Sequence, residues 1–323
     1  MRRIFGVTAG FIACAGPGVL DSLAQTYPAK PIHIVSGFSP GGGADVSARI
    51  VGPKLTEYLG KPVIVENRPG ASTAIATEYV AKAPADGYTL LLLPSSTTIL
   101  SAMRRSLPYN MERDFTPISL LVTGQYVLVV HPSVPAKNAA DLIKITRAQP
   151  GRLTYGSSGL GSASQLAAEL FKSMAKVDIL HVPYKGANDA AIATATGEID
   201  MFFASIAPLL PLQATGKVKV LGVTGAKRTP LMPAVPTISE SGLPEYERYA
   251  WYGLIAPAGL PADIVAKLNA AIRKAGDTAE IKEIFSKQGL DSQTTTPEQF
   301  AAFIKNDLMR NNKLVSAAGL KAE

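Results

Sequence analysis

The sequence contains almost no cysteine. Its single cysteine, Cys14, lies in an N-terminal segment with the features of a secretory signal peptide. If that segment is removed, the mature chain can form neither a disulfide nor a cysteine-ligated metal site. Such a chain suits an oxidising compartment, because it cannot form an incorrect disulfide.

The N-terminal segment itself predicts export. Arg2 and Arg3 supply positive charge, residues 4–15 are apolar, and Ser22 and Ala24 place small residues before a cleavage point. These are the three parts of a signal peptide. The apolar run is too short to span about 30 Å of hydrocarbon. We therefore expect an exported chain cleaved near Ala24, with a buried N-terminal helix or a lipidated Cys14 as the alternatives.

Long apolar runs and clusters of like charge are also absent. After residue 24 no segment reaches about 18 uncharged apolar residues, so no further membrane span is expected. The formal net charge is +7, but the Lys and Arg residues are scattered, which argues against nucleic-acid binding. The positive charge favours anionic ligands or serves only solubility.

Patterns for catalysis and metal binding are missing as well. The three histidines, His33, His131 and His181, lie in or beside apolar strands without metal-site spacing. The glycine-rich turns match neither the G-x-S-x-G elbow nor the nucleotide-binding motifs. We therefore predict no metal, no cofactor and no enzymatic activity. A hydrolase using Ser158 or Ser162 with His181 as base remains an alternative, because triads assemble in space.

Short β-rich runs alternate with helical patterns along the chain, which is typical of βαβ units and an α/β fold. We expect strands at 32–35, 63–65, 88–93, 126–131, 153–155, 179–182, 201–203, 218–223 and 251–256. We expect helices at 45–59, 72–82, 138–149, 162–175, 189–197, 208–215, 262–275, 279–288 and 297–314. Residues 90–93 are all leucine, so the strand at 88–93 is expected in the centre of a sheet.

The βα pattern begins a second time near residue 126, which predicts two lobes with separate cores. About 300 residues are enough for two such cores. We place the first lobe at 25–124 and 252–323 and the second at 125–251. The chain would cross between them near 125–132 and 251–257, where strands end close to proline. The terminal helices would then complete the first lobe.

A glycine-rich turn after the first predicted strand is the first candidate ligand site. It contains Ser39, Gly41 and Gly42, and a helix begins near Asp45. Ligands in open α/β sheets bind beyond the carboxyl ends of strands, and a helix start offers free N–H groups to an anion. Asp45 opposes an anion, so it caps the helix or orients the loop. A tight turn without a ligand is the alternative.

The second turn offers polar groups at the next strand end. Asn67 carries amide donors, and Ser72 caps a helix or donates to a ligand. Arg68 could bind a carboxylate with two hydrogen bonds, or pair with Glu66.

Hydroxyl groups dominate the third and fourth turns. In the fourth, a helix begins near Ser162, so the same argument for an anion applies. In the third, the hydroxyls either line a polar cleft or belong to a solvated loop. The residues of the two turns are Ser95, Ser96, Thr97 and Thr98, and Ser157, Ser158 and Ser162.

Several motifs resemble, in order, those of the Bug family of periplasmic solute receptors. These are the TctC-like components of tripartite tricarboxylate transporters. The resemblance covers nearly the whole mature chain, and it implies a two-lobed periplasmic-binding-protein fold (type II-like) with a ligand cleft between mixed sheets flanked by helices. The motifs include Phe38-Ser39-Pro40-Gly41-Gly42, Glu66-Asn67-Arg68-Pro69-Gly70, Asp86-Gly87-Tyr88, Asp114-Phe115-Thr116-Pro117, Val182-Pro183-Tyr184-Lys185-Gly186 and Val235-Pro236-Thr237.

The resemblance also implies a periplasmic location and a function. The cleft would close over a small carboxylate (a di- or tricarboxylate, an amino acid or an aromatic acid), and the receptor would deliver it to membrane permease subunits. We expect a monomer, and a sensor for a signalling membrane protein is the alternative. The candidate ligand-binding residues, most of them carried over by motif, are Ser39, Gly41, Gly42, Asp45, Asn67, Gly70, Ser72, Ser95, Ser96, Ser157, Ser158, Ser162 and Gln165.

Departures from the family pattern lie close to the expected cleft. Ser72, Thr73 and Ala74 replace a run that is often glycine-rich in the family, and Gln165 stands where a histidine is common. The ligand is therefore left open among polar and aromatic carboxylates.

Overall fold

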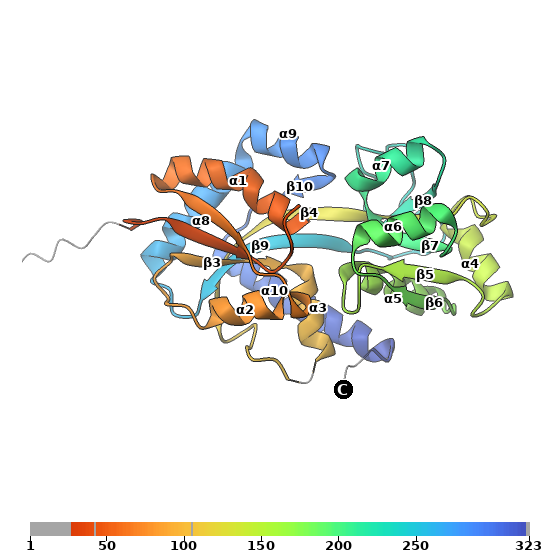
Figure 1. The fold of residues 1–323 in the computed structure, drawn as a ribbon, viewed down its shortest axis with the longest axis horizontal. Helices are drawn as coiled ribbons and strands as arrows, with labels where there is room; N and C mark the ends of the chain where they lie inside the picture. Colours follow the sequence, from red (N-terminus) through yellow and green to blue (C-terminus); the bar gives the residue numbers. More distant parts are fainter. Residues whose placement is uncertain (1–26, 42, 105, 321–323) are drawn as a thin grey trace, which may run out of the picture.

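Two lobes, each built around a β-sheet, lie side by side (Figure 1). The computed structural model describes residues 27–41, 43–104 and 106–320, so the predicted signal peptide lies outside the described residues. No described helix is both long and apolar enough to cross a membrane.

The first lobe contains a mixed sheet with the strand order β2-β1-β3-β9-β4, and β10 pairs with β4. The strands β1, β2 and β3 are parallel, whereas β9 runs antiparallel to both β3 and β4. The interior position of β3 confirms the prediction made from its leucine run. The strands are β1 (Ile32–Ser36), β2 (Val63–Asn67), β3 (Thr89–Pro94), β4 (Phe115–Val130), β9 (Tyr249–Pro257) and β10 (Leu290–Ser292).

Helices cover both faces of this sheet, because alternate residues of its strands point to opposite sides. In β3, Leu90 and Leu92 join the core beneath one set of helices, and Leu91 and Leu93 join the core beneath the other. The first set is α1 (Gly43–Leu59), α8 (Ala262–Asp277) and α9 (Ala279–Lys287). The second set is α2 (Ala74–Ala81), α3 (Ser95–Met103) and α10 (Pro297–Ala317).

The second lobe is built around the end of β4, which pairs with β7 on one side and β8 on the other. Beyond β7 follow β5 and β6, both parallel to it. The elements are α4 (Ala139–Ala148), β5 (Thr154–Ser157), α5 (Ala163–Ala175), β6 (Leu180–Pro183), α6 (Ala187–Thr196), β7 (Met201–Ser205), α7 (Ile206–Ala214) and β8 (Lys219–Val223).

The chain connects the lobes through β4, β9 and α10. Strand β4 pairs with β9 from Phe115 to Gln125 and with β7 from Tyr126 onward, so one strand belongs to both sheets. Helix α10 places Phe300 in a core of the first lobe and Val315 in the core of the second. The terminal helix therefore spans both lobes (Figure 1). The sequence analysis had expected it only to complete the first lobe.

The structure adds three elements that the hydrophobic pattern did not predict. They are α3, the first half of β4 and the short strand β10. In β4 the pairing register shifts between Pro117 and Ser119, because proline cannot donate to a ladder and is placed at irregularities. The strand therefore lacks a regular alternation over its first half.

Candidate functional site

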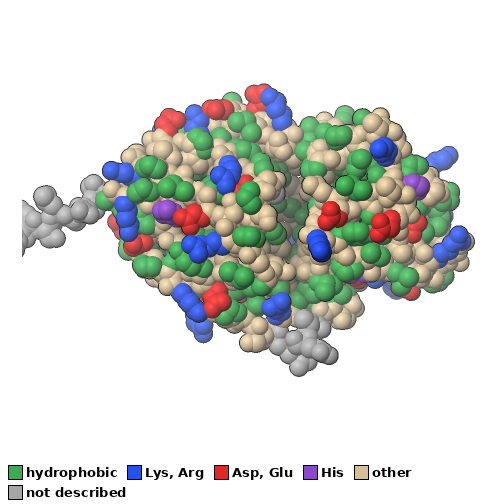
Figure 2. Space-filling view, in the orientation of Figure 1, with side chains coloured by type: hydrophobic (Ala, Val, Ile, Leu, Met, Phe, Trp, Pro, Cys, Tyr) green, Lys and Arg blue, Asp and Glu red, His purple; other side chains and the backbone are tan. Residues whose placement is uncertain are grey.

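The four predicted turns lie at strand ends that point toward the boundary between the lobes. Strand β4 runs from the first lobe into the second. The parallel strands β1, β2 and β3 run in the same direction as β4, because β9 is antiparallel to both β3 and β4. Strands β7 and β5 run the opposite way. The carboxyl ends of the two sets therefore face each other, and Figure 2 shows a groove between the lobes.

Asp45 organises the first two turns. Its carboxylate accepts hydrogen bonds from the Gly41 N–H (3.0 Å), from Arg49 Nε (3.0 Å) and from Asn67 Nδ2 (2.8 Å). Asn67 Nδ2 also donates to the Phe38 carbonyl (3.0 Å), and its Oδ1 accepts from Arg49 Nη2 (3.0 Å). The amide of Asn67 is thus fully engaged within the protein. Both residues are candidate ligand-binding residues, and the sequence also suggested that Asp45 orients the loop. Their hydrogen bonds show that both hold the loop together.

The electrostatics of this network favour an ionised Asp45. Burial alone would raise the pKa of its carboxyl, but the hydrogen bonds from Arg49, Gly41 and Asn67 outweigh that effect and hold the pKa below its ordinary value. Asp45 therefore balances the Arg49 charge and leaves little free anion attraction at this point.

The second turn adopts an unusual backbone conformation. Ala71, Ser72 and Thr73 have φ values of 46°, 53° and 83°, in the left-handed region that disfavours residues with a Cβ atom. Thr73 N–H donates to the Gly70 carbonyl (3.0 Å), and its hydroxyl lies 2.8 Å from the Thr97 hydroxyl. These bonds hold the turn against α3 and leave Ser72 exposed.

The first and second turns are also in direct contact. A Cβ atom at Gly37 would lie only 2.8 Å from Cβ of Thr73, so only glycine allows this approach. The departure from a glycine-rich run at residues 72–74 is therefore accommodated by strain in the second turn and by a glycine in the first.

The third predicted turn is the buried first turn of α3. All four of its hydroxyl residues are buried, so it is not a solvated loop. Thr98 Oγ1 donates to Asp307 Oδ2 (2.6 Å) and accepts from Asn311 Nδ2 (3.1 Å), which ties the helix to α10. Ser95 and Ser96 are buried residues as well, and the buried Ser96 Oγ has no partner among the described residues.

The fourth turn is held by its own side chains. The Ser164 hydroxyl contacts the hydroxyls of Ser158 and Ser162 (3.1 Å each) and accepts from the Ser158 N–H (3.0 Å). Ser162 caps α5 by accepting from the Gln165 N–H (3.3 Å), and Gln165 Oε1 accepts from the Gly161 N–H (2.7 Å). The N–H groups left for a ligand are those at the start of α5, which have no partner inside the helix.

Ser157 lies deeper and pairs with a histidine. Its hydroxyl is 2.7 Å from His181 Nε2, while the other ring nitrogen, Nδ1, lies 3.4 Å from Gln165 Nε2. The serine is fully buried, and the third group is a neutral amide where a catalytic set would have a carboxylate. The pair fixes β5 against β6. The sequence analysis raised Ser158 and Ser162 as alternative nucleophiles; within the described part of the chain, the hydroxyls of both contact Ser164 and not His181.

The imidazole of His181 is held in its neutral form. Burial lowers its pKa; the Glu169 carboxylate opposes this effect, and the Lys172 ammonium adds to it. The ring stacks on Tyr155 at 4.7 Å, and the Tyr155 hydroxyl donates to Glu169, which also pairs with Lys172. This arrangement supports the floor of the fourth turn.

The remaining predicted residues differ in their placement. Ser39 and Gly41 are exposed, and Gly42 lies outside the described residues. Gly70 has a φ of 137°, and a Cβ atom there would meet the Ile75 side chain. Arg68 lies 3.5 Å from Glu66 and stacks on Tyr79. Of the two partners that the sequence left open, a ligand carboxylate or Glu66, the structure shows Glu66.

Two further side chains join the turns and were not predicted. A Cβ atom at Gly43 would lie 2.6 Å from the Tyr252 hydroxyl, so this tyrosine of β9 reaches the start of α1. Burial raises the pKa of Tyr252 to about 12, so its hydroxyl keeps its proton and can donate. Met103, the last residue of α3, lies 3.4 Å from a Cβ position at Gly161, which places the end of this helix beside the fourth turn across the lobes. The sequence gives no local signal for either contact, because both depend on the packing of distant segments.

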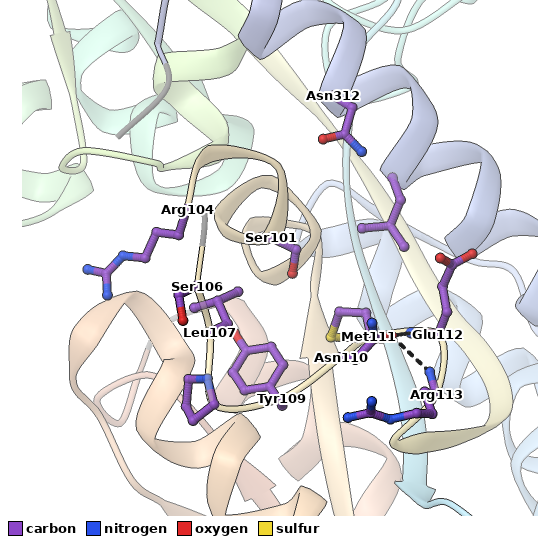
Figure 3. A pocket seen from close by; sticks show the side chains of 12 residues that line it. Ser101, Arg104, Ser106, Leu107, Tyr109, Asn110, Met111, Glu112, Arg113 and Asn312 are labelled. Carbon is purple, nitrogen blue, oxygen red and sulfur yellow. Dashed lines mark hydrogen bonds between the residues drawn. The ribbon is translucent and has the colours of Figure 1, made fainter. Parts of the chain in front are cut away.

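Other possible sites are less well placed. Among residues 27–41, 43–104 and 106–320, no group of three or more His, Cys, Asp or Glu side chains could hold a metal ion. A cavity of about 610 Å³ lies between α3, the segment 106–113 and α10 (Figure 3). It is lined by Arg104, Tyr109 and Arg113 among others, and by none of the predicted site residues.

The comparisons with known proteins agree with this geometry. The BugT protein of Bordetella pertussis is 36% identical over 324 residues, with 99% of each chain covered. A solved structure of an R. palustris protein with adipate matches at a TM-score of 0.83 and 33% identity, covering 91% of this chain and 98% of that one. The structure of MatC from Rhodopseudomonas palustris with bound malate matches at a TM-score of 0.79 and 31% identity, covering 90% and 100%.

A family model identifies the group to which these proteins are related. Residues 47–320 match the TctC model, described as the tripartite tricarboxylate transporter family receptor. The fold is that of the periplasmic binding proteins of this family, which bind a solute and do not transform it. The chain therefore belongs to the TctC (Bug) family of periplasmic receptors of tripartite tricarboxylate transporters.

Proposed function

We propose that this receptor captures a small carboxylate in the groove between its lobes and delivers it to the membrane subunits of a tripartite transporter. The observation that carries the proposal is the opposed placement of β1, β2 and β3 against β5 and β7, with Met103 at the end of α3 beside Gly161 of the fourth turn. Relatives with the same fold were solved with adipate and with malate, both dicarboxylates.

Closure of the lobes is the proposed mechanism. A ligand that contacts both lobes only in the closed state shifts the population toward that state. The two moving bodies would be residues 25–124 with 252–323 and residues 125–251, since β4 changes partners at Gln125 and Tyr126. Ser39, Gly41, Gly42, Ser72 and the start of α5 would contact the carboxylate. Asp45 and Asn67 would act indirectly, by holding the shape of the first turn, which contains Ser39 and Gly41.

The proposal is tested by titration calorimetry with malate, adipate and citrate on the mature protein. We expect at least one to bind with the ligand recovered unchanged. Ser39→Tyr would fill the groove and weaken binding at least about tenfold, equal to about 1.4 kcal/mol. The matched control Ser173→Tyr changes an exposed position of α5 away from the turns and would leave binding intact. Absence of binding to any carboxylate, or conversion of a bound one, would contradict the proposal.

Transport is favoured over a sensory role because the matching family is described as a transporter receptor. We further propose that the exported protein is a periplasmic monomer that begins at Gln25. Mass spectrometry of protein purified from the periplasm would find that N-terminus, and light scattering would give the mass of one chain. An N-terminus at Met1 or Cys14, or a dimer mass, would refute these points.

A further inference from the structure

A second cavity lies behind the groove, where the chain crosses between the lobes. Its volume is about 510 Å³, and its walls come from β4, β9, β10, α10 and the segment 226–230 that follows β8. Both lobes therefore contribute to it.

The cavity and the groove lie on opposite faces of the β4–β9 pair. Thr123 pairs with Trp251 and Gln125 with Tyr249, and all four line the cavity. The next residue, Tyr252, points to the other face and reaches the start of α1 beside the groove. A ligand in this cavity would thus occupy a site distinct from the predicted one.

Arg248 supplies this cavity with a buried guanidinium group that could bind a ligand. Its side chain is only 9% exposed, and its Nε and Nη2 atoms are buried without an acceptor among the described residues. Its Nη1 lies 4.0 Å from Asp307 Oδ1, on the remaining side of the guanidinium. The backbone is fixed by Thr224, which accepts from the Arg248 N–H (2.8 Å) and donates to its carbonyl (2.6 Å).

The two free nitrogens define the chemistry of the missing partner. Nε–H and Nη2–H form one edge of the guanidinium and point in parallel, which matches the two oxygens of a carboxylate. Leaving buried charged donors unpaired is costly, so this edge favours an acceptor. Trp251 Nε1 is a further buried donor without a described partner, and Trp251 also lines the cavity.

The other lining groups agree with an anion that has a small apolar body. Lys227, Arg228, Arg248 and Arg310 oppose Glu247, Asp291 and Asp307, which leaves an excess of one positive charge. Burial raises the pKa of Asp291, which makes that carboxyl easier to neutralise. Pro230 and Phe303 supply apolar wall beside Trp251.

We propose that this cavity is a second ligand site, which holds a small organic carboxylate on the Nε/Nη2 edge of Arg248. The site does not depend on the function of the groove. Its position between the lobes means that an occupant contacts segments of both.

The test uses Trp251 as its reporter, because it is the only tryptophan in the sequence. Benzoate, a monocarboxylate with a small ring, is titrated into the mature protein while tryptophan fluorescence and the melting temperature are followed. We expect a saturable fluorescence change and a rise in melting temperature. Arg248→Lys keeps the positive charge but loses the two parallel N–H donors, so the benzoate affinity measured by this response should fall at least tenfold. Arg248→Met would abolish the response.

Controls separate this site from the groove and from a folding defect. Arg273→Met removes an exposed arginine of α8 and would leave the response unchanged, and so would the groove variant Ser39→Tyr. Without benzoate, a cooperative melting transition of Arg248→Met shows that the variant is folded, a necessary control because the change removes two buried unpaired donors and also the cationic partner of Asp307. A wild type without a saturable response, a response that survives in Arg248→Met, or one lost in Ser39→Tyr would overturn the proposal.

Discussion

The left-handed run in the second turn leads to a prediction with an internal control. Ala71 has a φ of 46° and is exposed, whereas Ala74, three residues later, has a φ of −58° in the first turn of α2. The same substitution by glycine should therefore have opposite effects on stability at the two positions.

The magnitudes follow from the backbone. An alanine in the left-handed region costs about 1–2 kcal/mol relative to a right-handed one, and glycine avoids that cost. Glycine also gains about 0.4–1 kcal/mol of unfolded-state entropy, which offsets part of the benefit. Ala71→Gly should therefore stabilise the fold by about 0.5 kcal/mol. Ala74→Gly should destabilise it by about 1 kcal/mol, because glycine is a poor helix former.

Urea denaturation of the two variants measures the difference, which should be about 1.5 kcal/mol. We also expect Ala71→Gly to bind the groove ligand more weakly, because strain retained at a binding loop serves to fix its shape. If Ala71→Gly destabilises the protein as much as Ala74→Gly does, the left-handed turn is not the folded conformation and the reasoning fails.

Three other predictions concern the loop network and its support. Asp45→Ala should cost about 1–2 kcal/mol and loosen the first turn, since it removes the buried acceptor that Gly41, Arg49 and Asn67 share; an unchanged melting temperature would argue against the network. Gly37→Ala should cost about 1–3 kcal/mol, because its Cβ would press on Thr73, and calorimetry would detect this. The pKa of His181 is lowered on folding, so its contribution to stability is complete above about pH 6.5 and is lost as the pH falls below that value. Urea midpoints at about pH 7.5 and about pH 5.5 should therefore differ less in His181→Gln than in the wild type; equal differences would refute the assignment.

The sequence predicted the parts of the fold that depend on local pattern. Most helices and strands followed from periodicity, and the all-leucine run at 90–93 placed β3 inside a sheet. Helix α3 was missed because Ser95–Thr98 has the composition of a loop. Its hydroxyls are buried by α10, whose Asp307 lies 209 residues further along the chain. A contact over that distance leaves no trace in the local sequence.

The candidate site shows the same division. Glycine-rich turns and strand ends located the four turns, but residue type alone did not assign a role to each side chain. The sequence suggested loop orientation as one role for Asp45, but only the hydrogen bond from Asn67 to Asp45 shows that the two residues hold the loop together. The unpaired Nε and Nη2 atoms of Arg248 could not be predicted from the sequence, because no sequence pattern shows that a side chain lacks a hydrogen-bond partner.

The path of α10 bears on the proposed closure of the lobes. Three links join the lobes, and the helix is anchored in both, because Phe300 packs on β9 beside Gly253 and Val315 lies in the core of the second lobe. If the lobes close as proposed, these links would resist twisting of one lobe against the other more than bending, and closure would be a small rotation about one axis. An extended ligand would keep the lobes apart. The path of the backbone would then contribute to selectivity for compact solutes.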